Sequence, residues 1–385
     1  MTERYRIAIA GAGGMGQATG LLLRELGDFD VDLYLGDADA DKAREAAEWI
    51  CHDSTRTGVV EPFHLPAQGT SPAFDTVLRG AHLLLDCLPG EEATRMARLA
   101  RENHLHYANL TEYVKATNEI TELARGAEQG FLLQTGLAPG YVNVLGNGLF
   151  QRFRQEHGVD RVDTLEMRVG ALTRTTRPPH QYGFTWNPKG VATEYVEPAV
   201  VIRDFQKTTR PSLGDRRIVL IDGHLYEEAL TSGGAADLPS ELEGKVRNLD
   251  YKTFRYPGHY EWVAGLLDEM RSAGVPEEEL SHRLLQSMLE VVPFVEDDLV
   301  IIYAAVEGRD DRGSRGTLHR LESSRVIRPR KVGGHRLKAI QTTTSAGLAE
   351  SARLLLRDRP RGVYFQSQID PVRFMDGPFV STIYG

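Results

Sequence analysis

Ionisable and aromatic side chains are concentrated in residues 251–263, whose sequence is YKTFRYPGHYEWV. Arg255 and His259 flank Pro257 and Gly258, a pair that must turn the backbone. The planar guanidinium of Arg255 can bind a carboxylate through two parallel hydrogen bonds, and the imidazole of His259 titrates near neutral pH. The surrounding aromatic rings would cover methylene groups and exclude water. The pattern predicts a substrate pocket with His259 as a catalytic base, or else an arginine and a histidine that pin a turn at an interface.

A glycine-rich turn near the start of the chain, GAGGMG at residues 11–16, has the spacing of a dinucleotide-binding loop. Gly11 allows a tight turn, Gly13 lets the backbone approach a pyrophosphate, and Gly16 lets the following helix pack closely on the preceding strand. That helix offers unpaired N–H groups and the positive end of its dipole to the phosphates. We therefore expect cofactor contacts from Gly11, Gly13, Gly14, Met15 and Gly16.

Asp37 ends the second predicted strand and is the residue expected to choose between the two nicotinamide cofactors. In dinucleotide-binding folds, an acid at this place accepts a hydrogen bond from the 2'-OH of the adenosine ribose, whereas a 2'-phosphate would meet its negative charge. Asp37 therefore favours NAD. Lys42 and Arg44 follow on a predicted helix, either exposed or close enough to neutralise a phosphate, so NADP stays as the alternative cofactor.

Three further loops, CLPG at residues 87–90, NLTEY at 109–113 and GLAPG at 136–140, follow predicted parallel strands. Ligands bind at this end of such strands, and the glycines and prolines let the backbone run beside the nicotinamide ribose and ring. Cofactor contacts are expected from Cys87, Leu88, Pro89, Thr111, Ala138 and Pro139. Glu112 is a second candidate base, because a desolvated carboxylate there would have a raised pKa. An acid that stabilises a helix N-terminus is its alternative role.

Composition limits the classes of function that this chain can have. Its 385 residues exceed the usual size of one core and 41% of them are hydrophobic, so we expect two folded domains. A formal net charge of -9 argues against nucleic acid or an anionic membrane as the main partner. The first residues lack the apolar run of a signal peptide, and no segment approaches the length of a membrane span. We expect a cytoplasmic protein that acts on a small molecule.

The two cysteines, Cys51 and Cys87, form no disulfide framework and match no zinc-ligand spacing. We expect both to be buried thiols, and we expect no metal site.

The order of predicted elements indicates an α/β fold with a doubly wound parallel sheet. Short apolar segments such as RIAIA, VDLYLG and AHLLLDC alternate with helical ones through the first third of the chain. Later segments such as VDTLEMRVGALT are long and strand-like, with polar turns between them. We predict a Rossmann-type domain over residues 1–140 and an α+β second domain over residues 141–340. Residues 341–385 become helical again and are expected to pack back on the first domain.

Motifs spread over nearly the whole chain resemble the saccharopine dehydrogenase family. They are GAGGMG, CLPG, NLTEY, GLAPGYVN, FTWNPKGVATEY, TSGG, GKVRNLDYKTFRYPGH and IQTTTSAG, in this order. The resemblance implies a Rossmann domain, a mixed-sheet domain for substrate binding and dimerisation, and NAD(P)-linked oxidation of an amine or reduction of an imine. It therefore implies a homodimer that acts on a lysine-type amino acid.

The branches that these motifs resemble are saccharopine dehydrogenase, lysine 6-dehydrogenase and carboxynorspermidine dehydrogenase. Saccharopine-forming members commonly carry an acid in the middle of the GLAPG motif, where this chain has Ala138, so lysine 6-dehydrogenase-like activity is favoured. A polyamine enzyme is the alternative substrate class. A non-catalytic NAD(P)-binding sensor is the alternative kind of protein, since a fold does not fix a function.

The substrate pocket implied by this resemblance draws on several motifs. Arg255 would clamp a substrate carboxylate, and the FTWNPKG segment would form a second wall, or else an interfacial loop. Substrate contacts are expected from Arg255, Tyr256, Asn143, Trp186 and Lys189.

Overall fold

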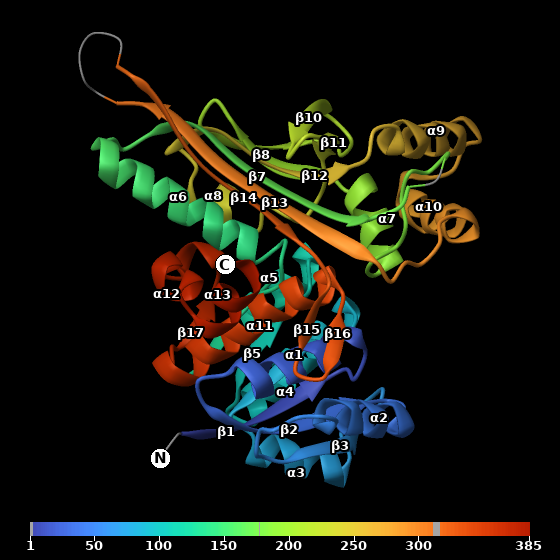
Figure 1. Cartoon of the computed structure of the whole chain (residues 1–385), viewed down its shortest axis with the longest axis vertical. Coiled ribbons are helices and arrows are strands. Elements are labelled where there is room, and N and C mark those ends of the chain that lie inside the picture. Colours follow the sequence, from blue (N-terminus) through green and yellow to red (C-terminus); the bar gives the residue numbers. More distant parts are fainter. Residues whose placement is uncertain (1–2, 177, 311–315) are drawn as a thin grey trace. The chain divides into compact units, whose positions relative to one another are not determined.

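The computed structural model describes residues 3–176, 178–310 and 316–385, and the chain divides into two compact units (Figure 1). Unit 1 comprises Met1–Val144, Arg330–Leu337 and Gln341–Gly385, and unit 2 comprises Leu145–Pro329 and Lys338–Ile340. The boundaries after Val144 and after Ile340 fall inside two helices, α6 (Tyr141–His157) and α11 (Ala339–Asp358).

Unit 1 is built on a seven-stranded sheet in which every described strand pair is parallel. The strand order is β17-β6-β5-β4-β1-β2-β3. The strands are β1 (Arg4–Ala10), β2 (Asp30–Asp37), β3 (Val60–His64), β4 (Leu83–Asp86), β5 (His106–Asn109), β6 (Gly130–Leu132) and β17 (Gly362–Tyr364). Because β1 pairs with both β2 and β4, the direction of winding reverses beside β1, where doubly wound folds bind their ligands.

Helices alternate with these strands, as parallel connections require. They are α1 (Gly14–Leu26), α2 (Ala40–Cys51), α3 (Pro72–Gly80), α4 (Ala93–Glu102), which follows the short η1 (Gly90–Glu92), and α5 (Val114–Leu123). Local signals fix where they begin. The Asp39 side chain accepts hydrogen bonds from two N–H groups at the start of α2, and the Ser71 hydroxyl accepts one from Phe74 at the start of α3. The central strands, apolar and buried on both faces, pack between these helices.

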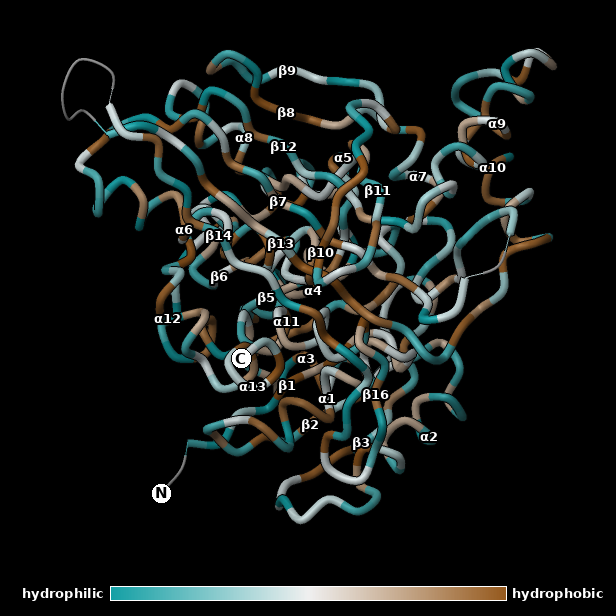
Figure 2. The backbone as a smooth tube through the Cα atoms, turned by 45° about the horizontal axis from the view of Figure 1, so that its top comes forward, coloured by the Kyte–Doolittle hydropathy of each residue, from teal (hydrophilic) through white to brown (hydrophobic). Residues whose placement is uncertain are grey.

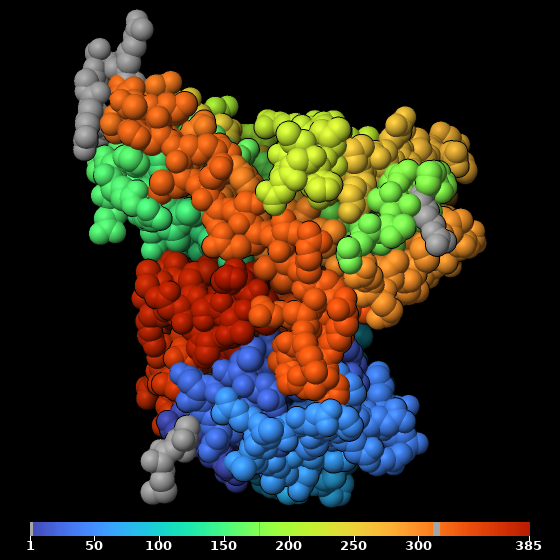
Figure 3. All heavy atoms as spheres, viewed as in Figure 1, coloured from blue at the N-terminus to red at the C-terminus, as the bar shows by residue number. Residues whose placement is uncertain are grey.

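The C-terminal part of the chain completes unit 1 (Figure 3). It contains most of α11, η2 (Gln366–Gln368), α12 (Pro371–Met375) and α13 (Pro378–Tyr384), with the hairpin β15 (Arg330–Val332) and β16 (His335–Leu337). The Thr19 hydroxyl on α1 donates to the Ser345 hydroxyl on α11 at 3.1 Å, and both residues are fully buried. The rings of Tyr141 and Tyr384 stack with centroids 3.6 Å apart.

Unit 2 has an eight-stranded mixed sheet with the order β10-β11-β12-β7-β13-β14, in which β8 also pairs with β12, and β9 pairs with β8. The strands are β7 (Val162–Thr173), β8 (Ala199–Arg203), β9 (Gln206–Arg210), β10 (Arg217–Ile221), β11 (His224–Leu230), β12 (Val246–Arg255), β13 (Asp298–Arg309) and β14 (Leu318–Ile327). The pair β12–β7 is parallel, and the other described pairs are antiparallel. The predicted α/β class with a second, mixed sheet is confirmed.

The helices of unit 2 besides α6 are α7 (Pro188–Val196), α8 (Leu238–Glu241), α9 (His259–Ser272) and α10 (Glu277–Val291). The buried residues of α10, Leu280, Leu284 and Met288, recur every four positions and form one apolar stripe. Figure 2 shows the matching alternation of polar and apolar segments along α9 and α10. These stripes pack with residues of α7 into one apolar cluster.

One sequence expectation about the cysteines is wrong. Cys51 is exposed at the end of α2, because the buried face of that helix is formed by the alanines and Ile50 that precede it. None of the described helices is long and apolar enough to cross a membrane.

Candidate functional site

The glycine-rich loop joins β1 to α1 in unit 1 and leaves room for a ligand at the start of the helix. Gly11 has φ +99°, which an L side chain rarely adopts, so the turn needs glycine here. A Cβ on Gly16 would lie 1.8 Å from the carbonyl oxygen of Gly11. Gly13 is the N-cap of α1 and has no side chain to satisfy the first N–H groups. Those groups, around Gly14 and Met15, are therefore available to a pyrophosphate.

Asp37 lies at the end of β2 with its carboxylate against this loop. One oxygen, Oδ2, accepts a hydrogen bond from the N–H of Ala12 at 3.0 Å, and Oδ1 accepts one from Asp39 at 3.2 Å. The ammonium of Lys42 lies 3.5 Å from Oδ2 and about 4.0 Å from the position of a Cβ on Gly13. A ribose hydroxyl can still reach the carboxylate, since each oxygen has a second lone pair. Lys42 partly offsets the charge that would repel a 2'-phosphate.

The loop after β4 meets the glycine-rich loop through the backbone of Cys87. A Cβ on Gly11 would lie 3.0 Å from the carbonyl carbon and oxygen of Cys87. Burial raises the pKa of the Cys87 thiol far above its usual value, so the thiol is neutral. Leu88 packs partly buried against the apolar core, and Pro89 is exposed as the N-cap of η1. This loop therefore presents backbone rather than a reactive side chain.

The loop after β5 contacts the loop after β4. A Cβ on Gly90 would lie 2.5 Å from the hydroxyl oxygen of Thr111 and 2.5 Å from the ring of Tyr113. Glu112, half-buried between them, has its pKa raised by desolvation and by the nearby Glu91. It lies at the carboxyl end of a parallel strand, as the sequence predicts for the second candidate base.

The GLAPG segment closes on itself beside these loops. Gly140 has φ +136°, and a Cβ on it would lie 2.1 Å from the carbonyl oxygen of Gly136. Asn143 is fully buried, and its Oδ1 accepts a hydrogen bond from the N–H of Gly140 at 2.8 Å. Ala138 is half-buried and Pro139 is buried within this turn. Asn143, expected to contact substrate, thus fixes the shape of the loop.

In unit 2, Arg255 and His259 lie together in a buried chain of hydrogen bonds. The Arg255 side chain is 1% exposed, and its Nη2 is 2.8 Å from Oε1 of Glu194. Its Nε donates to the hydroxyl of Tyr195 at 2.6 Å, and that hydroxyl lies 3.0 Å from Nε2 of His259. Nδ1 of His259 lies 2.6 Å from the carbonyl oxygen of His180.

The partners of His259 fix its protonation. A carbonyl can only accept, so Nδ1 carries the proton, and Nε2 accepts from the Tyr195 hydroxyl. Burial, together with the charge of Arg255, lowers the pKa of His259 to about 3. Because β12 ends at Arg255 and α9 begins at His259, the chain of bonds braces the turn at Pro257 and Gly258. This arrangement supports the alternative in which the pair pins a turn.

The remaining predicted substrate residues of unit 2 lie at different places around this hydrogen-bonded cluster. The Tyr256 hydroxyl donates to the carbonyl of Thr173 at 3.0 Å, and its ring packs with residues of β11 and β13. Trp186 packs against the apolar cluster of α7, α9 and α10, which includes Tyr195. Lys189 is exposed in the first turn of α7, where its N–H donates to Asn187 at 3.1 Å.

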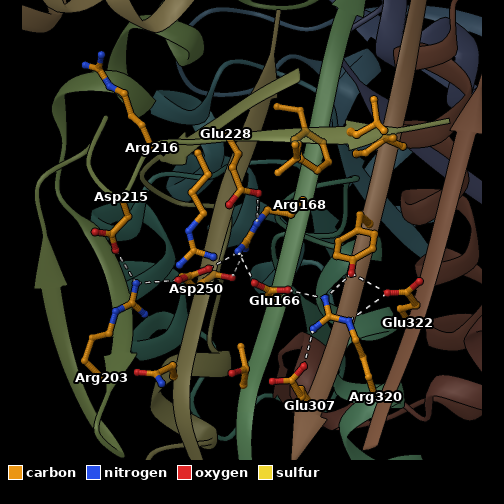
Figure 4. A pocket seen from close by; sticks show the side chains of 18 residues that line it. Glu166, Arg168, Arg203, Asp215, Arg216, Glu228, Asp250, Glu307, Arg320 and Glu322 are labelled. Atoms are coloured by element: carbon orange, nitrogen blue, oxygen red, sulfur yellow. Dashed lines mark hydrogen bonds and ion pairs between the residues drawn. The ribbon is translucent and has the colours of Figure 1, made fainter. Parts of the chain in front are cut away.

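A charged face on the unit 2 sheet was missed by the sequence analysis (Figure 4). Arg168, 2% exposed, lies 2.8 Å from Glu228, 2.7 Å from Asp250 and 3.3 Å from Glu166. The row continues from Asp250 to Arg203 at 2.7 Å and from Glu166 to Arg320 at 2.9 Å. It lines a cavity of about 900 Å³. Charged residues at alternate positions in LEMRV and LDYKT were the available signal, because alternate residues of a strand share a face.

No group of three or more His, Cys, Asp or Glu side chains that could hold a metal ion occurs among the described residues. The features that fit a ligand are the dinucleotide loops of unit 1.

Two comparisons with known proteins cover nearly the whole chain. The family model described as saccharopine dehydrogenase NADP binding domain matches residues 7–132, and that described as saccharopine dehydrogenase C-terminal domain matches residues 136–377. The structure is similar to apo saccharopine dehydrogenase (L-Glu forming) from Saccharomyces cerevisiae, with TM-score 0.73 and 13% identity over 96% of each chain. It is also similar to a homospermidine synthase from Legionella pneumophila in complex with NAD, with TM-score 0.64 and 14% identity over 99% of this chain and 90% of that one.

Replacing Asp37 with Ser should weaken the preference for NAD over NADP. The change removes an acceptor for the ribose and the charge that opposes a 2'-phosphate, while Lys42 remains. The ratio of the two dissociation constants should fall about tenfold, or ~1.4 kcal/mol, measured by fluorescence titration with NADH and NADPH. The same change at Asp160, whose side chain is 95% exposed in unit 2, should leave the ratio unchanged. An unaltered ratio in Asp37→Ser, or a wild type that prefers NADPH, would contradict the assignment.

His259→Asn should change how the stability of the protein depends on pH. The pKa of His259 is lowered from 6.5 in the unfolded chain to about 3 in the folded one, so the unfolded state binds the extra proton between these values. Wild-type stability therefore falls as pH drops below about 6.5, by ~1.4 kcal/mol per pH unit for this group.

Asparagine cannot take up that proton, so this slope should be absent from the variant. At pH 8 the variant should be less stable by about 1–3 kcal/mol, since Tyr195 loses its acceptor, and the difference should shrink at pH 5. Urea unfolding at several pH values measures both. Parallel pH profiles would show that His259 is not held neutral in the folded protein.

Proposed function

The chain belongs to the saccharopine dehydrogenase family, and from this premise we propose that it oxidises an amine, or reduces an imine, at the C–N bond of a lysine-type amino acid. The family matches, which cover residues 7–132 and 136–377, make it an NAD(P)-binding oxidoreductase. The observation that carries the proposal is that two regions of the chain match this family. The match includes the C-terminal domain, which we expect to bind substrate, as well as the dinucleotide-binding domain, a type of domain that many other enzymes share.

The geometry of the glycine-rich loop in unit 1 suits the binding of NAD(P). The start of α1 would hold the pyrophosphate, because its N–H groups are uncapped and its glycines leave the backbone open. Asp37 would bind the adenosine ribose, and the loops at residues 87–90 and 136–140 would contact the nicotinamide end. The bound nicotinamide supplies the hydride acceptor or donor.

The proton of the amine needs a group of the protein to take it. We assign this task to Glu112 in preference to His259, because both ring nitrogens of His259 are already hydrogen-bonded inside unit 2. Glu112 follows β5 and is half-buried, and desolvation raises the pKa of its carboxyl, which is the direction that a proton acceptor in catalysis requires. Arg255 is paired with Glu194, so in this proposal it supports the site by bracing the fold of unit 2.

Among the possible reactions, Ala138 favours one like that of lysine 6-dehydrogenase. Saccharopine-forming members commonly have an acid at this position of the GLAPG turn, and this chain has none. A polyamine substrate is the second candidate. The structural similarity to a homospermidine synthase in complex with NAD supports it, since that likeness spans 99% of this chain.

We also propose that the chain forms a homodimer through the β10–β11 hairpin of unit 2. Leu220 on β10 and Leu225 on β11 are cross-strand partners that are 68% and 57% exposed, on the face of these strands opposite the charged row. Ile218, on the same face as Leu220, is 59% exposed. An exposed apolar patch of this kind suits a second copy, because a twofold axis brings the same patch of both copies together.

A panel of amines should identify the donor. With NAD present, absorbance of the reduced cofactor should rise with L-lysine, or with saccharopine or a carboxylated polyamine, and should not rise with amino acids that lack a second amine. Glu112→Gln should lower kcat by about 10²–10⁴ while NADH binding is kept. If the protein binds the cofactor, but no amine reduces NAD and no imine oxidises NADH in the reverse assay, a non-catalytic NAD(P) sensor is favoured. If Glu112→Gln keeps the full kcat, another group must take the proton of the amine.

The dimer can be tested with a matched pair of variants. Light scattering at micromolar concentration should give twice the chain mass for the wild type, and Leu220→Glu should give the monomer mass because it buries a charge in the interface. Leu289→Glu, on α10 and 48% exposed, should stay dimeric. A monomeric wild type would contradict the proposed assembly.

A further inference from the structure

A buried chain of hydrogen bonds links the loops that border the cofactor site in unit 1. Oδ1 of Asp86, at the end of β4, accepts from the N–H of Leu88 at 3.0 Å, and Oδ2 accepts from the Tyr107 hydroxyl at 2.8 Å. The Asn109 side chain donates to the same hydroxyl at 3.3 Å and accepts from the N–H of Gln134 at 2.9 Å. Asp86, Tyr107 and Asn109 are at most 2% exposed. The chain therefore joins the loop after β4 to the loop after β6.

The neighbours of Asp86 can satisfy the hydrogen bonds of its side chain in two protonation states. As a carboxylate it accepts from both Leu88 and Tyr107. As a neutral acid it can donate to the Tyr107 oxygen, because the Tyr107 hydroxyl has a second acceptor, the carbonyl of Ala93 at 3.1 Å. The Leu88 bond persists in both states, but only the carboxylate makes it charge-assisted, and such bonds are roughly twice as strong.

The neutral state is accessible at ordinary pH. Burial raises the pKa of Asp86 to about 7, against the lowering effect of its hydrogen bonds from Leu88 and Tyr107. The other titratable or charged groups facing it are Cys87 on its own loop, Glu92 in η1 and Arg95 in α4. Cys87 is neutral in this range, and Glu92 and Arg95 are paired with each other at 2.7 Å. Asp86 is therefore the group of this cluster that changes charge near pH 7.

We propose that Asp86 is a positioning residue for the nicotinamide half of the cofactor, which it acts on through the loop at residues 87–90, and that its ionisation sets how firmly that loop is held. The proposal needs the chain to bind NAD(P)H and this loop to contact the nicotinamide end. It does not depend on the identity of the amine substrate.

The expected pH dependence has a definite sign. As pH rises through about 7, Asp86 becomes a carboxylate, the loop is fixed, and less free energy is needed to order it on binding. NADH should therefore bind about fivefold more tightly at pH 8.5 than at pH 6. ADP-ribose lacks the nicotinamide, so its dissociation constant should be nearly the same at both values.

The test is a fluorescence titration of the intact protein with NADH, and a competition titration with ADP-ribose, from pH 6 to 8.5. Asp86→Asn imitates the neutral acid, because the amide can accept from Leu88 and donate to Tyr107. Its affinity for NADH should be independent of pH and equal to that of the wild type at pH 6. Asp160→Asn, on an exposed side chain of unit 2, should behave as the wild type.

Tyr107→Phe provides an independent measurement. It removes the donor to Oδ2 of Asp86 but keeps the ring, so the carboxylate is less stabilised and the midpoint of the NADH pH profile should move to higher pH. The proposal is overturned if the NADH profile of the wild type is flat, or if Asp86→Asn keeps the wild-type slope. Equal losses of NADH and ADP-ribose affinity in Asp86→Asn would also overturn it, since the loop would then not act on the nicotinamide half.

Discussion

The close approach of Gly16 to the carbonyl oxygen of Gly11 is the contact on which the cofactor site depends. With a Cβ only 1.8 Å from that oxygen, no other residue fits without moving α1 off the end of β1. The contact places uncapped N–H groups of α1 beside the point where the winding of the sheet reverses. The backbone of Cys87 lies against the same turn, so the loop after β4 is positioned by the same constraint. One backbone contact thus positions both the start of α1 and the loop after β4.

Most of the fold could be predicted from the sequence because local patterns and packing agree there. The segments IAIA and LLL are apolar throughout, as strands buried on both faces must be, and both lie in central strands of unit 1. The segment VDTLEMRVGALT is β7 as predicted, over Val162–Thr173. Pairing across the second sheet could not be predicted, because the partners of β7 lie far along the chain and its charged positions, such as Arg168, are matched only in three dimensions.

The chemistry-bearing residues were recognised by type, but their surroundings decide what they do. Arg255 and His259 carry groups suited to catalysis. In the folded core, however, these groups are hydrogen-bonded to Glu194 and Tyr195, which lie some sixty positions earlier in the chain. Unpaired, a buried guanidinium would be strongly destabilising, so the sequence has to supply such partners somewhere. Asp86 was overlooked for the opposite reason: it stands inside an apolar run, and its importance appears only when Tyr107 is found beside it.

The central claim is that this family member moves a hydride between the cofactor and a carbon that bears nitrogen. The most direct measurement uses L-lysine, or the amine that proves reactive, deuterated at the carbon next to the reacting nitrogen. Mass spectrometry of the NADH formed should show one deuterium per molecule, and turnover should slow if hydride transfer limits the rate. NADH that forms without deuterium would contradict the account, because the hydride would then come from a different bond.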